Sequence, residues 1–132
     1  MSSDEYVTIF QLIGGKAGVR KLVDRFYDEM ETHSEAKTIL LMHPKDLTSS
    51  REKLYLFLCG WFGGPSLYIE KYGHPRLRAR HLPFQIDSKA RDAWMLCMRV
   101  AMQEQFPDDD IRNQIDGAFY RLANHMRNIE DS

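Results

Sequence analysis

The chain has 132 residues, of which 43% are hydrophobic and 28% charged, and its formal net charge is −1 at pH 7. This length and balance indicate a single globular domain over residues 1–132 and exclude a disordered or fibrous protein. The near-neutral charge also argues against binding nucleic acid through overall charge, because such proteins are usually strongly basic.

The sequence contains no run of eighteen apolar residues, so we expect no membrane-spanning helix. The N-terminal MSSDEYVTIF is acidic at its start and lacks a long apolar segment, which is not the pattern of a secretory signal. Cys59 and Cys97 match no metal-binding or redox spacing, and both fall within apolar helical patterns, as buried free thiols do. We therefore expect a cytoplasmic protein.

The first part of the chain has the apolar period of helices. Residues 8–13 predict a short helix that ends at the Gly-Gly pair 14–15. Residues 16–32 predict an amphipathic helix, and a short turn or helix capped by Ser34 follows over 34–41. The apolar face of the second helix consists of Val19, Leu22, Val23, Phe26, Tyr27 and Met30.

In the middle of the chain, either Thr48 or Ser49 is expected to cap a helix, with Glu52 in the capping-box pattern. The Gly-Gly-Pro motif at 63–65 ends this helix. Residues 65–83 then hold two short segments, which Gly and Pro residues separate.

Two long helices complete the chain. Asp87 or Ser88 caps the first, which extends to Phe106, and PDDD at 107–110 is a helix N-terminal signal for the second. The apolar stripe of the last helix runs over 111–129. Because no segment shows a convincing strand pattern, the predicted fold class is all-α, with five or six helices.

The segment GHPRLRARHLPF at 73–84 allows three interpretations: a basic patch for phosphates, a metal site, or one functional histidine. None of the five histidines has a zinc-ligand spacing. His81 differs from the others because it closes a helical turn directly before Leu82-Pro83, a stiff corner. One histidine is sufficient when the metal arrives in a macrocycle such as haem. The nearby arginines then suit the haem propionates, or else they form a solvated basic face; they are Arg76, Arg78 and Arg80.

Two polar aromatic side chains, Tyr27 and Trp94, lie on apolar helix faces. Each carries a hydrogen-bond donor that needs a partner when buried. From the residues alone, each either donates to a backbone carbonyl within the core or contributes to a binding site.

Five segments, in order over nearly the whole chain, carry a resemblance to a known family. They are the Gly-Gly pair at 14–15, RFYDEM at 25–30, FLCGWFGGP at 57–65, GHPRLRARHLPF at 73–84 and RDAWMLCM at 91–98. Together they resemble the group II truncated haemoglobins, short globins whose fold is a two-over-two α-helical sandwich around a haem. The resemblance implies haem b as the cofactor.

The resemblance also implies roles for individual residues. His81 matches the proximal iron ligand, and the positions of the distal ligand pocket are occupied by Tyr27, His43 and Trp94. The implied haem-binding positions are Lys53, Leu54, Phe57, Arg78, Phe84 and Met98, with Lys53 and Arg78 near the propionates. The implied function is binding of dioxygen and other diatomic ligands at a pentacoordinate or weakly hexacoordinate iron, without assigned catalytic residues.

Two other functions stay open at this point. One is a haem enzyme with nitric oxide dioxygenase or peroxidase-type activity, which would need an external reductase because the sequence shows no nicotinamide motif. The other is a cofactor-free helical interaction module, in which His81 would be replaceable. Either a monomer or a homodimer is compatible with the sequence.

Overall fold

The computed structural model describes residues 7–131 and contains only helices and turns within that range. Its elements are α1 (Ile9–Ile13), α2 (Gly15–Thr32), the 3₁₀ helix η1 (Ser34–Ala36), α3 (Lys37–Leu40), α4 (Thr48–Trp61), α5 (Leu67–Tyr72), α6 (Leu77–His81), α7 (Ser88–Gln105) and α8 (Asp109–His125). The all-α prediction is confirmed, although residues 7–131 contain nine helices, counting the short ones and η1, instead of the five or six expected. Residues 1–6, which carry part of the argument against a secretory signal, lie outside the described residues. Over 7–131, no helix is both long enough and apolar enough to cross a membrane.

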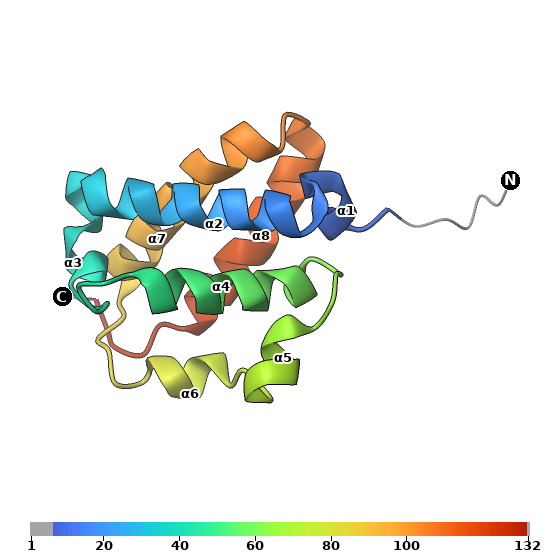
Figure 1. Cartoon of the computed structure of the whole chain (residues 1–132). Coiled ribbons are helices and arrows are strands. Elements are labelled where there is room, and N and C mark those ends of the chain that lie inside the picture. Colours follow the sequence, from blue (N-terminus) through green and yellow to red (C-terminus); the bar gives the residue numbers. More distant parts are fainter. Residues whose placement is uncertain (1–6, 132) are drawn as a thin grey trace, which may run out of the picture.

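The four long helices form two layers. Helices α2 and α4 lie together in one layer, and α7 and α8 pass behind them (Figure 1). The most extensive contacts join α2 to α7, α2 to α4 and α7 to α8. The short helices α5 and α6 follow α4 and run beneath it in the view of Figure 1. This is the two-over-two arrangement that the family resemblance implied.

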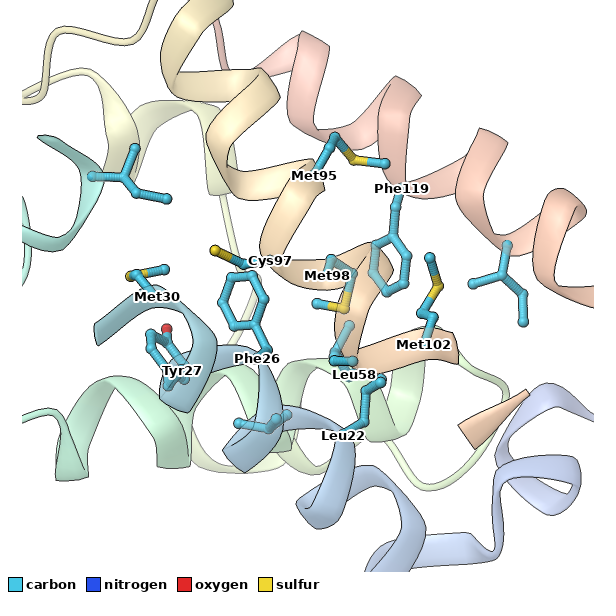
Figure 2. Close-up of a cluster of buried hydrophobic side chains, with 14 of the residues drawn as sticks. Leu22, Phe26, Tyr27, Met30, Leu58, Met95, Cys97, Met98, Met102 and Phe119 are labelled. Atoms are coloured by element: carbon cyan, nitrogen blue, oxygen red, sulfur yellow. The ribbon is translucent and has the colours of Figure 1, made fainter. Parts of the chain in front are cut away.

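The core fills the space between the two layers (Figure 2). All four long helices contribute fully buried side chains, which include Leu22, Phe26 and Met30 of α2, Leu58 of α4, Met95, Cys97, Met98 and Met102 of α7, and Phe119 of α8. Burying each large apolar side chain stabilises the fold by about 1.5–3 kcal/mol relative to leaving it in water. The stripe predicted for α2 is confirmed as a packed face, because all six of its residues are buried. Of the stripe predicted for the last helix, only Ile115 and Phe119 are buried within α8.

Helix α7 begins as predicted, whereas η1 does not. The Asp87 carboxylate accepts a hydrogen bond from the Ala90 backbone N–H at 2.9 Å, which makes Asp87 the N-cap of α7. Ser34, the expected cap of the 34–41 segment, is instead the first residue of η1. The N-cap is His33, whose Nδ1 accepts from the Glu35 backbone N–H at 3.2 Å.

The predicted cap of α4 was wrong. Thr48 is already inside the helix, and its N-cap, Leu47, provides no side-chain hydrogen bond. The acceptor is Asp46, whose carboxylate receives the Thr48 backbone N–H at 2.9 Å and its hydroxyl at 2.6 Å. Glu52 has a different partner, because its carboxylate accepts a hydrogen bond from Arg20 of α2 at 2.6 Å. The Glu52 carboxylate, which a capping box would have used, thus forms an ion pair with another helix.

The chain beyond α8 closes the turn that follows α6. The Asn128 side-chain amide donates to the carbonyls of Phe84, at 2.8 Å, and His81, at 3.2 Å. Its carbonyl oxygen accepts from the Ile86 backbone N–H at 3.0 Å. Helix α8 ends at His125, and Ile129, the last residue of the predicted stripe, is 40% exposed.

Candidate functional site

The backbone fixes the orientation of the His81 imidazole. His81 ends α6, and its Nδ1 lies 2.6 Å from the carbonyl oxygen of Leu77, four residues earlier. Because a carbonyl oxygen can only accept, Nδ1 must be the protonated nitrogen in this contact. In the neutral ring Nε2 then carries a free lone pair, which is the arrangement of a metal-binding histidine.

Two arginines of the 73–84 segment hold α6 in place by donating hydrogen bonds to backbone carbonyls. Arg78 donates from Nη1 to the carbonyls of His125, at 2.8 Å, and Arg127, at 2.7 Å. Arg80 donates from Nε to the Pro75 carbonyl at 2.7 Å. These bonds tie the helix that carries His81 to the end of α8 and to its own preceding turn.

A cavity of about 430 Å³ lies between α4, α6 and α8. Its apolar lining includes Phe57, Trp61, Leu77, Leu122 and Met126, and its polar lining includes His74, Arg76, Arg78 and His125. The residue whose carbonyl orients His81, Leu77, is thus also part of the cavity wall. The lining is thus mainly apolar, with Arg76 and Arg78 as its arginines, and His81 itself is not part of it.

A second group of side chains gathers Tyr27 of α2 and His43 of the turn after α3. Their ring centroids are 5.7 Å apart and their planes stand at 84°. The Nδ1 of His43 lies 2.8 Å from the Ile39 carbonyl and therefore donates to it. Burial lowers the pKa of His43; its hydrogen bond to Ile39 opposes that effect, and the charge of a protonated His81 adds to it. His43 is therefore neutral near pH 7.

Tyr27 stays a neutral phenol at physiological pH. Only 5% of the residue is exposed, and this burial raises its pKa well above the ordinary value, with a partial opposing effect from the positive charge of Arg51. Its hydroxyl is therefore available as a hydrogen-bond donor.

An aromatic wall connects this group to the cavity. Phe26 lies 4.9 Å from Tyr27 and 5.1 Å from Trp94, measured between ring centroids. Trp94 of α7 in turn lies 5.5 Å from Phe119, which stacks on Trp61 at 4.6 Å. Because Trp61 lines the cavity, the wall is continuous from Tyr27 to the space beside α6.

Comparison with known proteins agrees with this geometry. Residues 8–128 match the family described as bacterial-like globin. Over 114 residues, 86% of this chain and 84% of the relative, the sequence is 42% identical to group 2 truncated hemoglobin YjbI of Bacillus subtilis (strain 168). The chain belongs to the group II truncated haemoglobins.

Solved structures support the same assignment. The group II 2-on-2 hemoglobin of Agrobacterium tumefaciens superposes on this truncated haemoglobin with a TM-score of 0.91 and 45% identity, covering 98% of this chain and 100% of that one. The truncated oxygen-avid haemoglobin from Bacillus subtilis gives a TM-score of 0.81 at 40% identity, covering 92% and 100% respectively. Membership of a haemoglobin family implies that the protein binds haem.

The residues that the sequence assigned to haem contacts occupy varied positions in this truncated haemoglobin. Leu54 and Phe57 are half-buried on α4, and Phe57 lines the cavity. Met98 is fully buried in the core, between the layers (Figure 2). Phe84 is 39% exposed. Lys53 is also exposed, and its Nζ lies 6.0 Å from the centroid of the Tyr72 ring.

Two contributors to the site were not singled out from the sequence. The contact of the Leu77 carbonyl with His81 could have been predicted from the sequence, because a residue four positions before a histidine in a helical turn places its carbonyl near the imidazole. The position of Arg51 over the Tyr27 ring could not have been predicted, because Arg51 lies on α4 and its partners lie on another helix.

Proposed function

We propose that this truncated haemoglobin holds a haem b through His81 and binds dioxygen and other diatomic ligands. The observation that carries the proposal is the 2.6 Å contact from His81 Nδ1 to the Leu77 carbonyl, which leaves Nε2 as the free nitrogen of an oriented ring. When bound, haem supplies an iron that binds diatomic gases reversibly.

The cavity beside α6 has a mainly apolar lining that also contains arginines, which suits an apolar group that carries carboxylates. In this proposal Leu54, Phe57, Phe84 and Met98 contact the macrocycle and exclude water from it. The two cations that we assign to the propionates are Lys53 and Arg78. Supporting this, Phe57 and Arg78 both line the cavity, and the bonds of Arg78 to two carbonyls hold its guanidinium in place.

Two donors would retain the ligand, and we assign this role to the Tyr27 hydroxyl and the Trp94 indole N–H. His43 belongs to the same distal group through its contact with Tyr27. Because its one ring N–H donates to the Ile39 carbonyl, its Nε2 acts as an acceptor. A hydrogen bond to a charged acceptor contributes about 1.5–3 kcal/mol, so each donor would slow the release of a partly anionic ligand by roughly tenfold to a hundredfold. A solved relative described as oxygen-avid supports slow release.

The absorption spectrum of the purified protein tests the cofactor and its ligand together. Ferric, dithionite-reduced and carbon monoxide-treated samples should show an intense haem band that shifts with carbon monoxide, and His81→Ala should lose or weaken it. The matched control is His74→Ala, because His74 lies in the same segment and lines the cavity, but uses its Nδ1 to accept from the Arg76 backbone N–H at 3.1 Å.

Each outcome of this experiment has a definite meaning. A colourless protein that takes up no added haemin contradicts the proposal. A spectrum that responds to His74→Ala and not to His81→Ala moves the ligand to His74. The reduced spectrum also shows whether His43 or Tyr27 occupies the sixth coordination position before a gas is added.

A further inference from the structure

Arg51, in the first turn of α4, joins that helix to α2 beside Tyr27. Its Nη1 donates to both the backbone carbonyl and the carboxylate of Asp24 at 3.1 Å. Its Nη2 donates to the carboxylates of Asp28 and Glu31, both at 2.9 Å. The Arg51 side chain is 22% exposed, less than any of the three carboxylates, so the guanidinium is the centre of the cluster.

The three carboxylates share a face of α2 with Tyr27. Residues 24, 27, 28 and 31 have the i, i+3, i+4, i+7 spacing of one helix face. The guanidinium carbon of Arg51 lies 5.7 Å from the centroid of the Tyr27 ring. His43 contacts the same ring at 5.7 Å between centroids, so Arg51 and His43 are both neighbours of Tyr27.

The charges of this cluster oppose the preferences of their own helices. A cation in the first turn of α4 and an anion in the last turn of α2 each meet the unfavourable end of a helix dipole. Arg51 and Glu31 occupy those two positions. Neither charge stabilises its own helix, so any stabilisation that the two charges provide comes from the contact between α2 and α4. Locally unfavourable choices of this kind occur at functional sites.

We propose that Arg51 is a positioning residue for Tyr27, an inference that rests on the distal role proposed above for that tyrosine. By binding three carboxylates that flank Tyr27 and by covering its ring, Arg51 holds α4 against α2 at this point and keeps the phenol from turning toward solvent. Without the guanidinium, the first turn of α4 separates from α2, and the Tyr27 hydroxyl no longer stays on the ligand side.

The test compares Arg51→Met with Arg20→Met in the haem-containing protein. Arg20 is a matched control because it also joins α2 to α4, through Glu52 at 2.6 Å, but covers the Tyr55 ring at 3.9 Å instead of Tyr27. The first measurement is the C–O stretching frequency of the carbon monoxide-treated reduced protein, which reports hydrogen-bond donors around the ligand. The second is the oxygen dissociation rate.

We expect Arg51→Met to move the C–O frequency toward that of Tyr27→Phe and to raise the oxygen dissociation rate about tenfold, the loss of one good hydrogen bond. Arg20→Met should change neither. Arg51→Lys should restore only part of the wild-type frequency, because an ammonium keeps the charge but lacks the planar fork that serves several carboxylates.

The result that overturns the inference is a wild-type frequency and rate in Arg51→Met while Tyr27→Phe changes both. If Tyr27→Phe also changes neither, the proposed distal role of Tyr27 fails, and the inference fails with it. Should Arg51→Met not fold, Asp28→Ala and Glu31→Ala each remove one acceptor of Nη2. Frequencies unchanged in both of these variants would likewise reject the positioning role.

Discussion

His43 and His81 are held in the same way although they lie on different segments. In each ring Nδ1 donates to the carbonyl of the residue four positions earlier, Ile39 or Leu77, at 2.8 and 2.6 Å respectively. A helical turn brings the carbonyl of the fourth preceding residue close to the imidazole. Because Nδ1 donates in both rings, Nε2 is in each the nitrogen that is not bonded to the backbone.

At the same scale, Cys97 should be an unreactive thiol. Burial, with a smaller effect from Glu29, raises the pKa of Cys97 to about 11. Raising a thiol pKa favours the protonated form, so at pH 8 the thiolate fraction is about a hundredfold below that of an ordinary cysteine. In a Cys59→Ala variant, which leaves Cys97 as the single thiol, Ellman's reagent should react slowly with the native protein and at once after denaturation. Immediate reaction of the native variant would contradict this.

Residue patterns predict the N-cap of some helices correctly and fail to predict that of others. The Asp87 cap of α7 is predictable because the acidic residue directly precedes an apolar helical stripe. The cap of α4 is not, because Asp46, Thr48 and Ser49 are all suitable residues and only the backbone geometry at Leu47 selects among them. Single-sequence reasoning locates this helix correctly but assigns its first residue with an error of about one position.

The cap of α7 supports a prediction at this scale. Asp87→Ala removes the acceptor of the Ala90 N–H and should lower the free energy of unfolding by about 1 kcal/mol, or Tm by about 4 °C. Lys89→Ala, an exposed change in the first turn of the same helix, is the control and should have a much smaller effect. Equal melting temperatures for Asp87→Ala and Lys89→Ala would show that the cap contributes nothing. Thermal unfolding followed by circular dichroism provides the measurement.

At the scale of the whole molecule, Phe119 connects three of the four long helices. It comes from α8, stacks on Trp61 of α4 and meets Trp94 of α7 edge-on. It is fully buried (Figure 2). Because the aromatic wall between the Tyr27 group and the cavity passes through this ring, the same residue stabilises the fold and shapes the site.

Phe119→Ala should therefore lower the free energy of unfolding by about 3–5 kcal/mol, through lost burial and the cavity left behind. The adjacent residue offers a control, because Tyr120 is 38% exposed and has its ring 5.0 Å from the Arg91 guanidinium. Tyr120→Ala should cost no more than about 1 kcal/mol. Urea unfolding of both variants makes the comparison, and a loss below about 1 kcal/mol for Phe119→Ala would disprove its connecting role.

The sequence by itself determined the helices, and through the family resemblance it predicts His81 as the iron ligand. Apolar periodicity depends on residues three and four apart, so it identifies packed faces such as that of Leu22, Phe26 and Met30 without knowledge of the partner helix. His81 was identifiable because its corner before Leu82-Pro83 and its surrounding motif are local features of the chain.

Only the tertiary structure decided how those helices join around the site. Arg51 meets Asp24, Asp28 and Glu31 across separations of 20 to 27 residues, and Arg78 reaches carbonyls 47 and 49 residues away. Charged side chains on helix surfaces have many possible partners, and local periodicity does not choose among them. The crossing of α2 with α4 and the approach of α8 to α6 select these contacts, because they bring together groups that the chain itself keeps apart.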